Sequence, residues 1–435
     1  MERSERRRPV RFRALMRRAV VQHRVGRRVS RKRLSRSGSL NDITMTASIQ
    51  RTLRADDEVL VAGAGPAGLA TAMMLSQQGF RNVVVAEQRE GSSEEDPQRS
   101  YSYSIDVRSQ RLLQKLGLMH HLPSIGLATG DMKVHTVSPN GRVQQRSMAM
   151  KDQSIVNYWM PRTSFLQLLT RELLQCHSHS VRLLFNTSLQ SIELDGGRSQ
   201  SPVRATLRHQ SSGDTEHIEP ALVVGADGIK SRVRDALSEW DGGSKFDMHQ
   251  VDSPSAGLKF KVLSVSPELP LGRDNNDHAD VTEAIIYQPQ VRDKNRRVRL
   301  GSLPQKDSGR SRSINVINFP SHSIWSARDA ESVYSILEEN LPQLDVRSLI
   351  SREEVERFAK REEGAFPAPQ CPEQLTATIR SARNGSSTSP QSLESSGDPT
   401  SVAGVLLVGD ACHCFPPVRV SFHLLLFLIL KSTRS

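Results

Sequence analysis

The stretch that most constrains the fold of this chain is residues 56–90, DDEVLVAGAGPAGLATAMMLSQQGFRNVVVAEQRE. Its first apolar run, Val59–Ala62, is short and unbroken, which is typical of a parallel strand that is covered on both faces. Ala67–Gln78 has a helical pattern that ends at Gly79, and a second apolar run follows at Val83–Ala86. This order of strand, turn, helix and strand predicts a βαβ unit.

The turn between the first strand and the helix carries the pattern G-x-G-x-x-G, at Gly63, Gly65 and Gly68. In such a turn the first glycine permits a tight bend, the second lets a pyrophosphate approach the backbone, and the third lets helix and strand pack closely. The helix N-terminus then offers unpaired N–H groups to the phosphates. Glu87 ends the second strand, where a carboxylate accepts hydrogen bonds from ribose hydroxyls. A glycine-rich turn of an ordinary α/β protein does not explain Glu87, so we expect a dinucleotide site.

Further along the chain, helical and strand patterns alternate. An amphipathic helix is expected over Met160–Cys176, with Thr163 or Ser164 as its N-cap. Residues 256–320 alternate like the strands of a sheet, and basic turns separate them. Other short strands are expected at Val181–Phe185, Leu189–Leu194, Val203–His209, Leu222–Val224 and Val405–Val408.

The net charge of +12 over 435 residues is concentrated at the N-terminus. Residues 1–54 hold 17 Lys and Arg against three acids, a net +14, so the remaining chain carries −2. Rich in Arg and Ser and poor in acids, this extension has the composition of an organelle transit peptide. If the extension is a transit peptide, the expected location is a mitochondrion or plastid. If it is not, the expected location is the cytoplasm. A disordered basic tail and an RNA-binding arm are the alternatives, although no interleaved aromatics support nucleic-acid binding.

The cysteines at positions 176, 371, 412 and 414 fit a reducing compartment rather than a disulfide framework. Cys412-His413-Cys414 cannot close a tetrahedral site alone, and without a second Cys/His cluster we expect no metal. No apolar run reaches 18 residues, so no transmembrane helix is expected. The apolar tail Phe422–Leu430 is long enough only for weak contact with a bilayer surface.

Three stretches together resemble a known family. The glycine-rich unit at 59–87, GADGIKSRVR at 225–234 and LLVGDACHCFPP at 406–417 follow the order found in FAD-dependent aromatic hydroxylases, which have the p-hydroxybenzoate hydroxylase fold. RSYSYSIDVRSQRLLQKLGL, at 99–118, is most similar to the kynurenine 3-monooxygenase branch. The resemblance covers about residues 56–417 and implies an α/β fold. A Rossmann-like FAD-binding domain would carry an inserted, mostly antiparallel β-sheet as its substrate domain.

The resemblance also implies a division of the chain into domains. The FAD-binding domain would be discontinuous and would hold part of the substrate sheet. The expected parts are the basic extension 1–54, the FAD-binding domain 55–245, the substrate-domain sheet 246–345, a return to the FAD-binding domain at 346–417 with a low-complexity loop at 381–401, and an apolar tail unlike the family at 418–435.

Roles for single residues follow from the same resemblance. The turn residues would cradle the FAD pyrophosphate, Glu87 would hold the adenosine ribose with Gln88 beside it, and Arg108 and Arg162 would approach the flavin nucleotide. Surface ion pairs are the alternative for the two arginines. Asp227 and Gly228 would lie near FAD and the entry path of NAD(P)H, and Asp410, after Gly409, would accept a hydrogen bond from the ribityl chain. The turn residues are Gly63, Gly65, Pro66, Ala67 and Gly68.

Two positions depart from the family pattern. Met132 stands where kynurenine hydroxylases carry an arginine that clamps the substrate carboxylate, and Met cannot form that pair. Kynurenine is therefore not the expected substrate. In the family, two prolines lead into a glycine-rich turn and a helix, but here Pro416-Pro417 lead into an apolar tail without glycine. This predicts that family sequence stops near Val418, through truncation or a missed splice junction.

The function implied by the resemblance is an FAD-dependent monooxygenase. NADPH or NADH would reduce the flavin, and O₂ would form a flavin C4a-hydroperoxide that hydroxylates or epoxidises an apolar, ring-bearing small molecule. The sequence identifies no catalytic side chain and no oligomeric state. The alternatives are a truncated flavin-binding protein without turnover and a nicotinamide-only reductase, which would leave the motifs at Asp227 and Asp410 unexplained.

Overall fold

The computed structural model describes residues 53–91, 101–149, 156–195, 201–242, 245–273, 277–381 and 401–415. The predictions for the basic extension up to residue 52, for most of the loop at 381–401, for Pro416-Pro417 and for the tail at 418–435 lie outside these residues.

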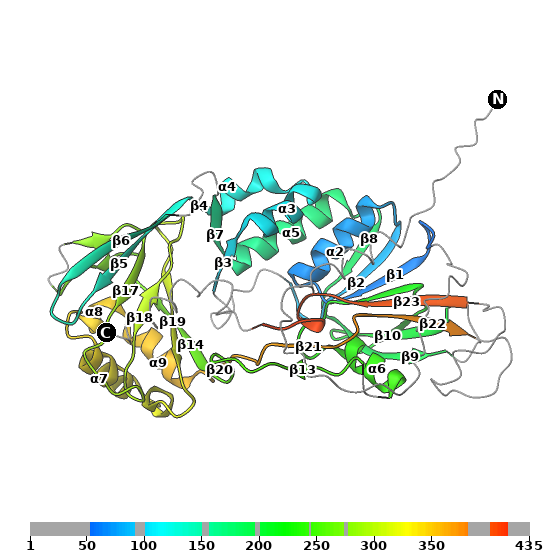
Figure 1. Cartoon of the computed structure of the whole chain (residues 1–435). Helices are drawn as coiled ribbons and strands as arrows, with labels where there is room; N and C mark the ends of the chain where they lie inside the picture. The colour runs from blue at the N-terminus through cyan, green and yellow to red at the C-terminus, as the bar shows by residue number, and fades with distance from the viewer. Residues whose placement is uncertain are drawn as a thin grey trace, which may run out of the picture.

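A six-stranded sheet forms the first half of the fold, and it contains the predicted βαβ unit (Figure 1). β1 lies between β2 and β12 and pairs in parallel with both. β8 and β23 add further parallel strands, and β22 is antiparallel at one edge. The strands are β22 (Thr376–Ser381), β23 (Ser401–Leu407), β12 (Leu222–Gly225), β1 (Glu58–Ala62), β2 (Asn82–Ala86) and β8 (Val181–Leu184), in that order.

Both faces of this sheet are covered, which explains the unbroken apolar runs of its central strands. Val59 and Val61 pack with α2 (Pro66–Gln77), α3 (Val107–Leu116) and α5 (Arg162–Cys176). Leu60 and Ala62 face the other way. They pack with α6 (Arg232–Asp241) and with a small sheet of β9 (Thr187–Leu194), β10 (Val203–His209) and β11 (Thr215–Ile218).

A seven-stranded sheet forms the second half, on the left of Figure 1. Every neighbouring pair in it is antiparallel except β17 and β5, which confirms the expected mostly antiparallel sheet. Its first two strands in the chain come from residues 131–149, well before the others. The order is β20 (Gly364–Ala365), β14 (Lys259–Val265), β19 (Arg312–Asn318), β18 (Leu300–Ser302), β17 (Ala284–Tyr287), β5 (Asp131–Val137) and β6 (Val143–Ala149).

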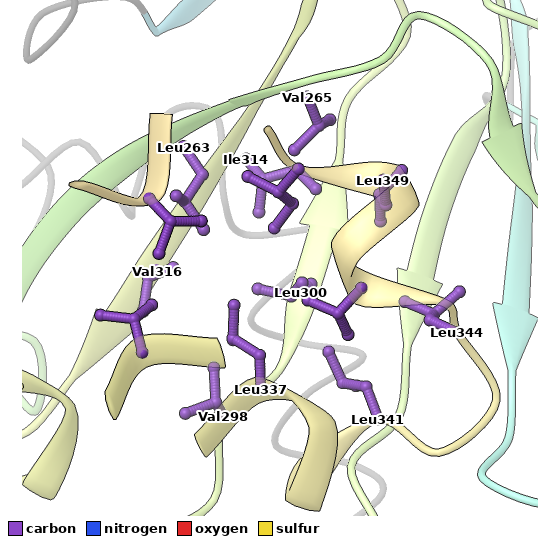
Figure 2. Close-up of a cluster of buried hydrophobic side chains, with 14 of the residues drawn as sticks. Leu263, Val265, Val298, Leu300, Ile314, Val316, Leu337, Leu341, Leu344 and Leu349 are labelled. Carbon is purple, nitrogen blue, oxygen red and sulfur yellow. The ribbon is translucent and has the colours of Figure 1, made fainter. Parts of the chain in front are cut away.

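One face of this sheet carries the largest apolar core of the described residues (Figure 2). Three helices cover it: α7 (Ala330–Asn340), α8 (Val346–Leu349) and α9 (Arg352–Lys360). Side chains from the strands meet side chains from the helices and their connections. The strand residues include Leu263, Leu300, Ile314 and Val316, and the partners include Leu337, Leu341, Leu344 and Leu349.

The opposite face of the same sheet carries a second apolar group, called here the sheet-face cluster. Its buried members are Met132, Val134, Trp159, Leu258, Ala284, Ile286 and Phe366, and partly buried side chains that include Phe260, Leu303 and Ile317 pack against them. Trp159 comes from β7 (Asn157–Pro161), which pairs with β3 (Ser102–Ile105) and β4 (Leu127–Thr129). No helix of the described residues is long and apolar enough to cross a membrane.

The predicted start of the helix at 160–176 is wrong. Met160 and Pro161 pair with β3 as the end of β7, so the backbone stays extended until Arg162, where α5 begins. Pro161 occupies the N-cap position without a side-chain hydrogen bond, and Thr163 lies inside the first turn. Strand pairing, which the local pattern does not contain, therefore sets this boundary.

We expect Leu337→Ala to lower the free energy of unfolding by about 2–5 kcal/mol, because Leu337 is fully buried beneath the seven-stranded sheet. The matched control is Leu174→Ala on α5, whose side chain is 48% exposed and which should change stability by less than about 0.5 kcal/mol. Urea unfolding followed by circular dichroism measures both. Equal effects of the two substitutions would contradict the assigned core.

Candidate functional site

Three motifs that are far apart in the sequence meet at one edge of the six-stranded sheet. β23, β12 and β1 are neighbours and run in parallel, so their carboxyl ends lie side by side. Backbone hydrogen bonds extend this pairing beyond the strands: Ala226 N donates to Ala62 O at 2.8 Å, and Val408 N donates to Gly225 O at 2.9 Å. In open α/β sheets ligands bind beyond this edge. In Figure 1 the red turn after β23 and the blue start of α2 meet there, facing the seven-stranded sheet.

Each of the three positions in the first motif is a glycine for a different structural reason. Gly63 has a φ of +96°, and a Cβ on it would lie 2.5 Å from Ala226 O. A Cβ on Gly68 would lie 1.9 Å from Gly63 O, so helix and turn require glycine there. A Cβ on Gly65 would meet no protein atom within 4 Å. Gly65 is also the N-cap of α2 and makes no side-chain cap, which leaves the first-turn backbone donors to a ligand. The open space at Gly65 fits a pyrophosphate.

Glu87 is held against this turn by two sets of donors. Its Oε2 accepts a hydrogen bond from Ala64 N at 2.9 Å, and its Oε1 accepts from Arg89 N at 3.0 Å and Arg89 Nε at 2.9 Å. Burial acts to raise the pKa of Glu87, but the bonds from Arg89 and Ala64 outweigh it and hold the pKa below its usual range. The carboxylate therefore stays ionised at neutral pH. Gln88, next to it, is exposed.

Asp227 follows β12 and presents one free acceptor. Its Oδ2 accepts from Arg232 N at 2.7 Å and Val233 N at 3.4 Å, at the start of α6. Its Oδ1 is buried and has no hydrogen-bond partner in the structure. Burial raises the pKa of Asp227, and the hydrogen bonds act against it. Gly228 has a φ of +84° and open space where a side chain would stand. An orphaned buried oxygen beside open backbone is what a ligand hydroxyl or amide would satisfy.

Asp410 and Arg162 come together although 248 positions separate them. Gly409, with a φ of +61°, turns the chain after β23, and a Cβ on it would lie 2.8 Å from Ala67 Cβ. Surrounding atoms desolvate the partly exposed Asp410 carboxyl and raise its pKa, while His413 and Arg162 act in the opposite direction. The backbone N–H of Arg162 donates a hydrogen bond to Tyr101 O at 3.0 Å, which anchors the backbone of this residue. Gly409 thus brings the Asp410 carboxyl beside the glycine-rich turn, where the charge of Arg162 acts on its pKa.

Arg108 is not brought to these residues. Its side chain is 84% exposed and pairs with Asp106 at 3.1 Å. Asp106 in turn caps α3 by accepting from Ser109 N at 2.9 Å. For Arg108 the structure therefore shows the surface ion pair that the sequence left as the alternative.

Arg234 is a structural residue of the site that the sequence reading missed. Its buried guanidinium donates to Ile229 O at 2.8 Å and to Ala411 O at 3.3 Å. These carbonyls belong to the second and third motifs, so one side chain ties the two turns together. Its position at the end of GADGIKSRVR, one helical turn past the N-cap Ser231, was the available signal.

The sheet-face cluster lies next to this site. Trp159, a member, precedes Arg162 by three residues, and Phe366, another member, precedes Gln370 by four. Gln370 exchanges two backbone hydrogen bonds of 2.9 Å with Cys414. At no more than about 3.3 Å per residue, Trp159 lies within about 10 Å of Arg162 and Phe366 within about 13 Å of Gln370, the partner of Cys414. Met132 belongs to the cluster and is 6% exposed, so this position forms apolar wall rather than a clamp for an anion.

The cysteines beside His413 are buried thiols. Burial raises the pKa of Cys412 to about 12 and that of Cys414 to about 11, so both stay protonated at neutral pH. Within the described ranges no three His, Cys, Asp or Glu side chains gather in a way that could hold a metal ion.

Comparison with known proteins places this architecture in a family. The model of the FAD binding domain family matches residues 56–320, which is more than half of the chain. The chain belongs to this FAD-binding family.

Curated relatives match a part of the chain. It is 26% identical over 196 residues to an FAD-dependent monooxygenase of Aspergillus terreus, covering 42% of this chain and 25% of the relative. It is 23% identical over 205 residues to pentachlorophenol 4-monooxygenase of Sphingobium chlorophenolicum, covering 47% and 36%. The chain therefore matches about a third or less of each relative's own length. The nearness to the kynurenine 3-monooxygenase branch stays a prediction.

Solved structures share the fold. The flavin-dependent monooxygenase PieE, in complex with FAD and substrate, has a TM-score of 0.56 at 14% identity, covering 83% of this chain and 54% of that one. Aklavinone-11 hydroxylase, with FAD and aklavinone, has a TM-score of 0.55 at 18% identity, covering 84% and 59%. p-Nitrophenol 4-monooxygenase PnpA of Pseudomonas putida has a TM-score of 0.52 at 16% identity, covering 83% and 74%.

We expect Gly65→Val to abolish tight FAD binding and to leave the thermal unfolding of the flavin-free protein unchanged. The new Cβ would enter open space at the turn with no protein atom within 4 Å, and the φ of −70° at Gly65 accepts a side chain. The control is Gly68→Ala. Its Cβ would clash with Gly63 O, so we expect this substitution to lower the melting temperature of the flavin-free protein. Flavin absorbance after gel filtration, with thermal melts, measures both. Stoichiometric bound flavin in Gly65→Val would refute the assignment of this turn to phosphate binding.

Arg234→Met should weaken FAD binding about tenfold or more, although we place Arg234 against the two turns and not against the cofactor. The substitution removes charge-assisted bonds to Ile229 O and Ala411 O, which together hold the second and third motifs in register. Arg234→Lys should retain part of the affinity. Fluorescence titration with FAD reports the change, and an unaltered affinity in Arg234→Met would show that the two turns hold their positions without it.

Proposed function

We propose that this chain is an NAD(P)H-dependent FAD monooxygenase that acts on an apolar aromatic small molecule. The observation that carries the proposal is the convergence of the three motifs at the sheet edge beside the sheet-face cluster. The family match supports FAD over a nicotinamide-only reductase. The two curated relatives, an FAD-dependent monooxygenase and pentachlorophenol 4-monooxygenase, support oxygen insertion into an aromatic ring.

The residues of the three motifs fit FAD. The turn at Gly63–Gly68 would hold the pyrophosphate, Glu87 would accept the ribose hydroxyls, and Asp227 Oδ1 and Asp410 offer acceptors towards the flavin end. FAD, when bound, supplies the redox chemistry that takes a hydride from NAD(P)H and activates O₂. Arg89 keeps Glu87 ionised, and Arg162 places a positive charge beside Asp410.

The sheet-face cluster would hold the substrate ring. Its buried members are all apolar, and two of them, Trp159 and Phe366, are aromatic. Phe260 stacks on Phe366 with ring centroids 4.9 Å apart, which extends the aromatic surface. Such a wall excludes water and orients a planar substrate by ring contacts.

We also propose that residues 1–54 direct the chain to a mitochondrion or plastid. The high Arg and Ser content with three acids supports this. Residues 1–54 fused to a fluorescent protein should accumulate in one organelle of a eukaryotic cell. Diffuse cytoplasmic fluorescence would favour the basic-tail alternative.

Pentachlorophenol and phenol are suitable first probes for turnover. We expect the FAD-loaded chain to oxidise NADPH or NADH, and at least one probe to accelerate this several-fold with matching oxygen consumption. Gly65→Val is the inactive control. Bound flavin that neither nicotinamide reduces under anaerobic conditions would contradict the proposal and favour a flavin-binding protein without turnover.

A further inference from the structure

Tyr103 is a half-buried tyrosine of β3 whose ring is held on two sides. It packs edge-on against the rings of Tyr101 and Phe165, with centroids 5.6 Å and 5.9 Å apart and interplanar angles of 86° and 88°. Both pairs have the T-shaped arrangement that aromatic rings favour. Phe165 lies on α5, three residues after Arg162. Contacts from a strand and from a helix therefore fix the position of the Tyr103 ring.

The strand register brings Arg162 within reach of this tyrosine. β3 and β7 are antiparallel, and Tyr103 pairs with Met160. Two residues further along the same ladder, Arg162 N donates a hydrogen bond to Tyr101 O. Arg162 is therefore opposite Tyr101 and diagonal to Tyr103, and long side chains reach across such a diagonal.

The Tyr103 hydroxyl interacts with both Tyr101 and Arg162. Burial is the largest effect on it and raises the pKa of Tyr103, Tyr101 raises it further, and the charge and hydrogen bonding of Arg162 act in the opposite direction. The hydroxyl therefore stays protonated at neutral pH. A protonated hydroxyl offers lone pairs to a guanidinium and a proton to another oxygen. Among the described residues no Asp or Glu forms an ion pair with Arg162, so this neutral hydroxyl is the contact that can direct its guanidinium.

The charge of Arg162 also acts on the third motif. Desolvation raises the pKa of Asp410, and His413 and Arg162 act in the opposite direction. Asp410 in turn acts on the thiols of Cys412 and Cys414, which both stay protonated at neutral pH. Among these groups, Arg162 is the one cation that comes from another element of the fold, since His413 belongs to the same turn as Asp410. One guanidinium thus connects the tyrosine on β3 to the carboxyl that we assign to FAD.

We propose that Tyr103 is a positioning residue of the FAD site: its hydroxyl holds the Arg162 guanidinium in the direction of Asp410 before the cofactor binds. Tyr103 itself does not touch FAD in this assignment. A long arginine side chain loses rotamer freedom when it is fixed in one place. A hydroxyl that restrains it beforehand removes part of that cost from the binding step. The inference rests on the proposed function for the identity of FAD as the ligand at this edge.

Fluorescence titration of the flavin-free full chain with FAD tests this role through a double-mutant cycle. Tyr103→Phe removes the hydroxyl and keeps the ring contacts, and we expect it to weaken FAD binding about three- to tenfold. Arg162→Met should weaken binding about tenfold or more. In the Arg162→Met background, Tyr103→Phe should have a further effect of less than about twofold. Tyr158→Phe is the matched control, because it removes a hydroxyl from the neighbouring strand in the same core cluster, and it should change the affinity by less than about twofold.

The pH dependence of the same titration supplies a readout that ring packing alone would not change. An ionised Asp410 is the stronger acceptor for a cofactor hydroxyl, so FAD affinity should fall as the pH drops through the pKa of Asp410. In the unmodified chain Arg162 acts to lower that pKa. Tyr103→Phe should release Arg162 and move the midpoint of the fall to higher pH, and Arg162→Met should do the same. Tyr158→Phe should leave the midpoint where it is.

Two results would overturn the assignment. One is an unchanged FAD affinity and pH midpoint in Tyr103→Phe. The other is an equal loss of affinity from Tyr103→Phe with and without Arg162, which would give the tyrosine a role in packing only. Because the titration needs neither NAD(P)H nor O₂, a coupled effect in a chain that never oxidises NAD(P)H would leave the positioning role standing and remove the monooxygenase. Probe-coupled oxidation without that coupling would do the reverse.

Discussion

The parallel pairing of β1 with both β2 and β12 is the constraint on which the rest of the site depends. This pairing places β1 inside the sheet, where both of its faces are buried and every polar backbone group finds a partner. It also sets the ends of three strands at one edge, so that Gly63, Glu87 and Asp227 follow adjacent strands. Pairing of β12 with β23 adds Gly409 to the same edge. Residues more than 300 positions apart thereby share one site.

The two carboxylates at this edge, Glu87 and Asp227, differ in the hydrogen bonds that the protein supplies to them, and this difference indicates where a ligand would bind. Glu87 is almost fully buried, yet it stays ionised because Arg89 and Ala64 donate to it. Asp227 is partly buried, and burial raises its pKa instead. Glu87 accepts hydrogen bonds from the protein at both oxygens, whereas Asp227 Oδ1 has no hydrogen-bond partner in the structure. The buried Arg234 holds the surrounding turns through their carbonyls, which fixes the positions of both motifs.

The seven-stranded sheet uses its two faces for different purposes. One face is closed by three helices and forms a continuous core. The other carries the sheet-face cluster, whose buried members are flanked by partly buried side chains such as Phe260 and Ile317. This is the face that we assign to the aromatic ring of the substrate.

The sequence by itself determined the βαβ unit, the three glycines, strands such as Val203–His209 and the acids that end β2 and β12, because period, glycine spacing and apolar runs are local properties. Only the tertiary structure decided the partners of those residues. The contacts of Arg234 with two turns, and the effect of Arg162 on Asp410, follow from packing. The start of α5 at Arg162 follows from strand register. Register joins residues far apart in the chain, and no local pattern encodes it.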